Sequence, residues 1–216
     1  MEEDTKKLFE IGLNDLPNHL PLFPLDNVLL LPFGKMPLNI FEPRYIKMIL
    51  ESLKKQRLIG IVQPKDNSGE FFNVGCMGKI TSFIETPDNR IVLNLDGICR
   101  FKISDSQLSQ GGYYNANVKT IDFVEDINVV EPMIDRDSLI KKFANFFKIK
   151  KYDLDLNIIE ETSNLQLLST LTMLAPFNKI DKQAILEAQN LIDRLEVVNS
   201  ILDLNTFTVV GSNSQH

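Results

Sequence analysis

The sequence predicts an α+β protein in which a β-rich half precedes an α-helical half. From Leu20 to about residue 130, short runs of β-forming apolar residues alternate with turn residues and isolated glycines. One stretch within that half, after Pro43, instead carries apolar residues at helical spacing. From about Met133 onwards the apolar residues recur every three or four positions, the period of an amphipathic helix. Together these patterns predict a small, partly closed β-barrel with one inserted helix, followed by a helical bundle.

The composition is that of a globular protein. Of 216 residues, 44% are hydrophobic and 24% are charged, and 23 Lys+Arg against 29 Asp+Glu give a net charge of −6. An acidic chain repels phosphate groups, which argues against broad binding to nucleic acid or to an anionic membrane. The start, residues 1–5, lacks the basic and apolar parts of a signal peptide, and the longest apolar run, 28–31, is too short to span a bilayer. We therefore expect a cytoplasmic protein with no membrane partner.

Prolines and turn residues divide the start of the β-rich half into short elements. Residues 20–25 contain two prolines, which favour an extended chain. The apolar run 28–31 and residues 38–41 predict two further strands. Turn residues at 26–27 and 32–35 separate these elements.

The rest of the β-rich half contains the inserted helix and four more extended segments. Pro43 suits the first turn of a helix, and the buried face of that helix is expected to hold Ile46, Ile49, Leu50 and Leu53. The remaining strands are expected at 58–62, 71–86, 91–103 and 113–124. The turn at 87–89 predicts an antiparallel hairpin of 80–85 with 91–95, and Gly97 predicts a bulge or bend.

Four helices are expected in the second half. The first has an apolar face formed by Leu139, Ile140, Phe143, Phe146 and Phe147, the second is a short helix at 154–159, and the third is capped by Asn164 and stopped by Pro176. Asn178 with Asp181 three residues later resembles a capping box, and one long last helix is expected to bury a face from Ile180 to Leu202. The expected division is a flexible arm (1–19), a barrel subdomain (20–130), a helical subdomain (131–205) and a polar tail (206–216).

The sequence contains no recognisable catalytic, metal-binding or cofactor-binding pattern. No phosphate-binding loop is present, because the Gly-Lys pairs are followed by Met36 and Ile80 where a hydroxyl residue is needed. The two histidines, His19 and His216, cannot supply a buried metal site or the base of a nucleophilic triad. The cysteines, at 76 and 99, form no CxxC pair and are interpreted as small core residues. We predict no catalytic residue, no metal and no cofactor.

Five segments that follow one another along the chain resemble those of a known family. They are Leu20-Pro-Leu-Phe-Pro-Leu25, Leu30-Leu-Pro-Phe33, Pro37-Leu-Asn-Ile-Phe-Glu-Pro-Arg-Tyr45, Val74-Gly-Cys-Met-Gly-Lys-Ile80 and Leu93-Asn-Leu-Asp-Gly-Ile-Cys-Arg-Phe101. The pattern resembles the N-terminal substrate-recognition domain of Lon proteases, in the short standalone form found in bacteria. The resemblance implies a PUA-like β-barrel joined to a helical bundle. Full Lon proteases also contain an ATPase domain and a Ser–Lys protease domain, and the resemblance extends to neither. The chain is therefore expected not to be an enzyme.

Seven residues are candidates for contact with a bound peptide. The turn 31–36, with Phe33 and Met36, is the first candidate surface, and Phe71 with Phe72 is the second. The other candidates are Phe41, Arg44 and Arg100. All but Met36 have a structural alternative. Phe33, Phe71 and Phe72 could close the ends of the barrel, and Phe41 could anchor the inserted helix to it. Arg44 could pair with Asp26 or Asp96, and Arg100 would need a partner if buried. A peptide could also add to an open sheet edge as an extra strand.

The leading hypothesis is a non-catalytic module that recognises unfolded or degron-bearing polypeptides. It would serve as a substrate adaptor or regulator in proteolysis or protein quality control, with an AAA+ protease or a chaperone as its partner. Two alternatives remain at this point. One is a small enzyme with an unrecognised site, and the other is RNA binding by a PUA-like barrel, which the acidic balance disfavours.

Overall fold

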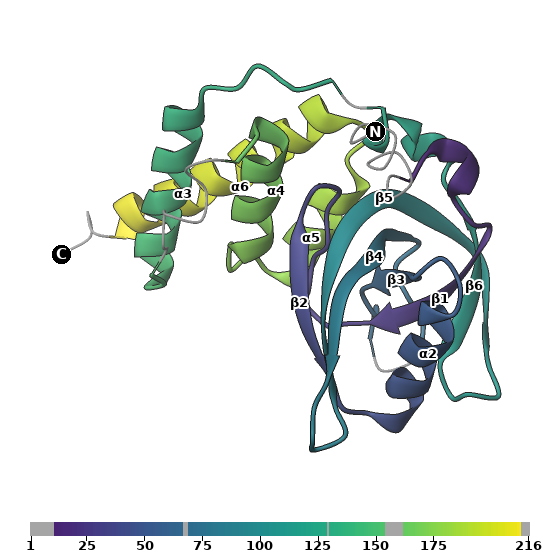
Figure 1. The fold of residues 1–216 in the computed structure, drawn as a ribbon. Coiled ribbons are helices and arrows are strands. Elements are labelled where there is room, and N and C mark those ends of the chain that lie inside the picture. Colours follow the sequence, from purple (N-terminus) through teal and green to yellow (C-terminus); the bar gives the residue numbers. More distant parts are fainter. Residues whose placement is uncertain (1–10, 67–68, 129, 154–161, 213–216) are drawn as a thin grey trace.

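The computed structural model describes residues 11–66, 69–128, 130–153 and 162–212. A curved sheet lies on one side of the molecule and most of the helices lie on the other (Figure 1). The strands are β1 (His19–Pro24), β2 (Lys35–Ile40), β3 (Leu58–Val62), β4 (Val74–Glu85), β5 (Ile91–Leu108) and β6 (Tyr114–Lys119). The α-helices are α2 (Pro43–Leu53), α3 (Arg136–Lys150), α4 (Asn164–Leu174), α5 (Lys179–Glu187) and α6 (Leu191–Ser212). The described residues also form two 3₁₀ helices, η1 (Leu13–Asp15) and η2 (Ile121–Asp126).

The six strands form one sheet in the order β2-β5-β4-β3-β1-β6, and β6 also pairs with β5. Five strands therefore form a closed circuit of pairings, while β2 lies outside it, so the sheet is not a clean barrel. The β1–β3 pair is parallel, and α2 lies between β2 and β3 along the chain. The predicted α+β class, with one helix inserted among the strands and helices after them, is confirmed.

The long strand β5 makes this geometry possible. Its first part pairs with β2, its last part pairs with β6, and β4 runs beside it from Ile91 to Lys102. The register against β4 shifts between Met77, which faces Cys99, and Gly78, which faces Gly97. The extra residue, Ile98, is the bulge expected at this glycine, and bulges bend a strand enough for it to serve two parts of a sheet.

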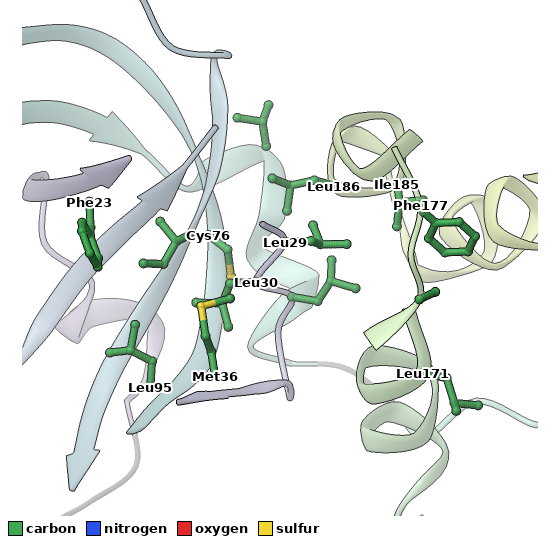
Figure 2. Packing of buried hydrophobic residues seen from close by; sticks show 14 of the residues in the cluster. Phe23, Leu29, Leu30, Met36, Cys76, Leu95, Leu171, Phe177, Ile185 and Leu186 are labelled. Atoms are coloured by element: carbon green, nitrogen blue, oxygen red, sulfur yellow. The ribbon is translucent and has the colours of Figure 1, made fainter. Parts of the chain in front are cut away.

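Two predictions in the β-rich half are wrong. Residues 28–31 form no strand but an irregular segment in which Leu29, Leu30 and Leu31 are buried. In Figure 2, Leu29 and Leu30 lie between side chains of the sheet and side chains of the helices. An irregular segment that is covered on both sides contains the same run of apolar residues as a buried strand. The sequence pattern therefore cannot distinguish an irregular segment from a strand here. The last strand ends at Lys119, before η2, and not at residue 124.

Three predictions about the helices also need correction. Of the expected face of α2, Ile49 is buried and Ile46 and Leu53 pack half-buried against the core, but Leu50 is exposed. The other fully buried residues of this helix are Tyr45, Met48 and Ser52. The cap of α4 is Ser163, whose hydroxyl accepts a hydrogen bond from Gln166 N, one residue before the expected Asn164. The long last helix is two helices, α5 and α6, separated by an extended residue at Ala188. Ile180, in the first turn of α5, is exposed.

Of the remaining expectations about the second half, one is confirmed, one is corrected and two are untested. Asn178 caps α5 by accepting a hydrogen bond from Asp181 N, as expected. The helix α6 continues through residues 211–212, which were expected to lie in a polar tail. The expected short helix at 154–159 lies outside the described residues, and the division at residues 19, 130 and 205 stays a prediction. None of the described helices is long and apolar enough to cross a bilayer.

A hydrophobic cluster runs without interruption from the sheet to the helices. It joins Met36, Cys76 and Leu95 to Phe177 and Leu186 through the leucines of 29–31 (Figure 2). Both cysteines are free and buried, as expected of small core residues. Burial raises the pKa of Cys76 well above its usual range and raises that of Cys99 to about 12.

We predict that neither thiol reacts in the folded protein. The nucleophile is the thiolate, and burial both blocks access and keeps these groups protonated at pH 8. Titration with Ellman's reagent is expected to give almost no reaction under native conditions and two thiols per chain in guanidinium chloride. Rapid stoichiometric labelling without denaturant would contradict the buried placement.

Candidate functional site

One hollow of the described surface is an open groove of about 970 Å³. It lies between the N-terminal segment around η1, the wall formed by β2, β4 and β5, and the segment that follows η2. Its lining residues are Ile11, Gly12, Asp15, Phe33, Gly34, Lys35, Arg57, Lys79, Thr81, Asp96, Gly97, Ile98, Asp126, Ile127, Asn128 and Gln166. These residues are scattered along the sequence, and of the candidate surfaces only the turn 31–36 contributes to this groove.

The groove combines partly exposed apolar side chains with basic ones. Phe33, Ile98 and Ile127 are half-buried. Three cations, at positions 35, 57 and 79, line the same hollow. The pKa of Lys79 is lowered, first by burial and then by the neighbouring charge of Arg57. Asp15, Asp96 and Asp126 line the hollow as well, so its charges balance overall. The surface therefore offers contact area to apolar side chains, and attraction to a carboxylate only locally, near Lys35 and Arg57.

The turn that carries Phe33 is fixed against β5. Phe33 N donates to Gly97 O at 3.0 Å, and Gly97 N donates to Gly34 O at 2.8 Å. Phe33 adopts φ 66°, a conformation that costs a non-glycine residue of order 1 kcal/mol and persists where the surroundings impose it. A Cβ at Gly97 would lie only 1.9 Å from Leu31 O, so the turn can approach the strand this closely only because residue 97 is glycine.

We predict that Gly97→Ala displaces this turn. The clash involves a backbone oxygen, which cannot rotate away, so the substitution should lower the free energy of unfolding by about 1–3 kcal/mol or more. Thermal denaturation measures the loss. Gly12→Ala is the matched control, because its new methyl group would meet nothing closer than 3.4 Å. Equal melting temperatures for the two variants would contradict the close approach.

Arg100 is buried at the junction between the sheet and the helices. Its Nε and Nη2 donate to both carboxylate oxygens of Asp126, at 2.8 and 2.9 Å. Its Nη1 donates to Leu186 O and Ala188 O, at the C-terminal end of α5. Its guanidinium also stacks on the ring of Phe123, 4.4 Å from the centroid. The expectation that a buried Arg100 would need a partner is confirmed, and this burial favours a structural role over direct contact with a peptide.

We predict that Arg100→Met strongly destabilises the protein. The variant would leave Asp126 buried without its bidentate partner and the last carbonyls of α5 without donors, which typically costs about 3–5 kcal/mol. Because each kcal/mol corresponds to roughly 2–4 °C in a chain of this size, the melting temperature should fall by roughly 6–20 °C. Arg90→Met, which breaks the exposed pair with Asp88, should change it by about 2 °C at most. Similar losses in both variants would contradict this role.

The seven candidate residues from the sequence do not form one site. Met36 and Phe71 are buried, Phe71 in edge-on contact with Tyr114, and Phe72 is half-buried. Burial favours the structural alternative for Phe71 and leaves Met36 little surface for contact with a peptide. Phe33 and Arg100 are brought together on one small cavity. The structure does not bring Phe71 and Phe72 to the groove.

Phe41 and Arg44 lie near each other, at the start of α2. Phe41 is 62% exposed, so it does not anchor the helix to the sheet. Arg44 pairs with Glu42 at 2.7 Å and stacks on the Tyr45 ring, 4.6 Å from its centroid. The expected partners Asp26 and Asp96 are wrong. A cation in the first turn of a helix is opposed by the helix dipole, and a carboxylate one residue before the helix offsets that repulsion.

A second hollow of about 380 Å³ lies between β1, α2 and β6. Tyr113 donates a 2.5 Å hydrogen bond to Glu51 there, and burial together with this carboxylate raises the pKa of Tyr113 to about 12. His19 lies on the rim and is exposed. Among the described residues there is no group of three or more His, Cys, Asp or Glu that could hold a metal ion.

Comparison with known proteins assigns the family. The sequence is 25% identical over 197 residues to a Lon protease from Endomicrobium trichonymphae, covering 87% of this chain and 24% of that protein. It is 26% identical over 196 residues to a Lon protease from Buchnera aphidicola subsp. Baizongia pistaciae, covering 85% and 24%. The chain thus spans about a quarter of the length of these relatives.

Solved structures share the fold. The Lon N-terminal domain protein from Xanthomonas campestris superposes with a TM-score of 0.63 at 21% identity, over 85% of this chain and 98% of that one. The N-terminal domain of the Mycobacterium avium complex Lon protease gives 0.56 at 14% identity, over 86% and 98%. The family model for the ATP-dependent protease La (LON) substrate-binding domain matches residues 19–203. The chain belongs to the LON substrate-binding domain family.

Proposed function

We propose that this chain recognises unfolded or degron-bearing polypeptides and binds them in the groove beside Phe33. Membership of a substrate-binding domain family fits a substrate-recognition module. We further propose that it acts in the cytoplasm as a non-catalytic adaptor or regulator in proteolysis or protein quality control, together with an AAA+ protease or a chaperone. The match covers only the N-terminal domain of Lon proteases, which supports recognition rather than catalysis.

The chemistry of the groove is the observation that carries this proposal. An unfolded chain differs from a folded one in offering apolar side chains, and Phe33, Ile98 and Ile127 present half-buried apolar surface to receive them. The cations at positions 35 and 57 would attract acidic residues that flank such a segment. The preferred ligand is therefore an extended, apolar segment with nearby carboxylates.

Binding by strand addition is less well supported. The end strand of the sheet is β2, and its third residue is Pro37. A proline within an edge strand offers no N–H to an added strand, and proline and lysine are residues that natural edges use to prevent pairing. Lys35, at the start of the same strand, is exposed. The open edge is thus protected, and side-chain contacts in the groove are the better route.

We predict that Lys35→Glu weakens the binding of an acidic unfolded polypeptide. Reduced, carboxymethylated α-lactalbumin is a suitable probe, with fluorescence anisotropy as the measurement. Reversing one exposed charge should raise Kd about fivefold at low ionic strength and less at high salt. Phe33→Ser removes apolar contact area and should raise Kd about tenfold at any salt concentration.

The controls separate the groove from other surfaces. Lys47→Glu, on the exposed side of α2, makes the same charge change outside the groove and should leave Kd unchanged. Phe41→Ser removes an exposed phenylalanine that also lies outside it. If Phe41→Ser weakens binding and Phe33→Ser does not, the groove is the wrong site. If the unaltered protein does not bind the probe at all, polypeptide recognition itself is wrong.

A further inference from the structure

A small cavity of about 30 Å³ lies where β5, η2 and the first turns of α4 and α6 meet. Its lining residues are Phe33, Arg100, Glu125, Asp126, Leu165, Asn190, Leu191 and Arg194. The volume is larger than the 10–15 Å³ needed for one water molecule and suits a monatomic anion or a single carboxylate group. The cavity is distinct in its lining from the groove, although Phe33 and Asp126 border both.

The buried charges around this cavity do not balance. Arg100 and Arg194 are only 1% and 3% exposed, and a single buried carboxylate, Asp126, faces both. Arg100 occupies both oxygens of that carboxylate, whereas Arg194 Nη2 lies 3.5 Å from one of them. The Nε of Arg194 is buried and has no hydrogen-bond partner within the described part of the chain.

The excess of positive charge disfavours the protonated form of Arg194. Its pKa is lowered to about 10, first by burial and then by the charge of Arg100. Water could accept the Nε hydrogen bond but would not neutralise the excess positive charge, and uncompensated buried charges are strongly unfavourable. Glu125 borders the cavity but is exposed and makes no ion pair with any residue that the structure describes.

Two helices add positive potential at the same place. Leu165 lies in the first turn of the 11-residue helix α4, and Leu191 is the first residue of the 22-residue helix α6. Helix N-termini carry partial positive charge and unpaired N–H groups, which favour a nearby anion. Asp193 in the first turn of α6 is bonded to Asn190 and offsets only part of this potential.

We propose that this cavity is a binding site for a small monovalent anion of the size of chloride, held by Arg194 Nε between Arg100 and the first turn of α6. The anion would supply a second full negative charge, beyond that of Asp126 and the partial charges of the α5 carbonyls that Arg100 already binds. Because sheet and helices both contribute to the site, bound anion would also stabilise their relative arrangement.

The melting temperature in 150 mM NaCl compared with 150 mM sodium gluconate tests this proposal at constant ionic strength. Gluconate is too large for the cavity, so chloride is expected to raise the melting temperature by roughly 2–5 °C. In Arg194→Met the difference between the two salts should vanish, while the melting temperature in gluconate should equal or exceed that of the unaltered protein. Arg90→Met, which removes an exposed arginine, should retain the full chloride effect.

Two further measurements keep the test decisive if Arg194→Met does not fold. Crystals grown in sodium bromide should show an anomalous peak within hydrogen-bonding distance of Arg194 Nε. Glu125→Gln removes the one carboxylate on the rim and should enlarge the chloride effect. Equal melting temperatures in the two salts, no bromide peak at Arg194, or an equal loss of stability in both salts for Glu125→Gln would overturn the proposal. The last result would mean that Glu125 itself neutralises Arg194.

Discussion

The arrangement of the sheet and the helices depends on the guanidinium of Arg100. This side chain leaves β5, binds the carboxylate at the end of η2 and donates to carbonyls at the end of α5. The last carbonyls of a helix have no partners within the helix, and a buried helix end needs donors from elsewhere. One residue therefore closes the end of α5 and determines where α6 can begin. A hydrophobic contact could not replace it, because apolar packing has no direction.

The position of the groove follows from the same junction. The turn 31–34 lies over Gly97, three residues before Arg100, and Ser169 of α4 donates to Pro32 O at 2.7 Å. A Cβ at Gly34 would overlap the sulfur of Met173, so the turn is held between strand and helix. Phe33 is thus presented to the groove by rigid elements on both sides. A recognition surface built in this way would lose little conformational entropy on binding.

Local features of this fold were predictable from the sequence, and long-range ones were not. The bulge beside Gly97, the hairpin of β4 and β5 and the cap of α5 depend on neighbouring residues and were correctly expected. The break at Ala188 was missed because its cause is distant: the carbonyls there are bound by Arg100, 88 residues earlier. The irregular run at Leu29–Leu31 was missed because burial on both sides erases periodicity. The groove could be predicted only through Phe33, since its other walls come from segments far apart in sequence.

The two buried arginines illustrate why a charged junction differs from an apolar one. If only stability mattered, hydrophobic residues of similar volume at positions 100, 126 and 194 would serve at least as well, since buried ion pairs seldom repay their desolvation. Directional bonds, however, fix one arrangement of α5 and α6 against the sheet and penalise any other by leaving charges unpaired. Gln183 extends the same principle, because from α5 it donates to Val74 O of β4 at 3.2 Å. A module that must present a groove of fixed shape gains more from such specificity than from additional apolar contact.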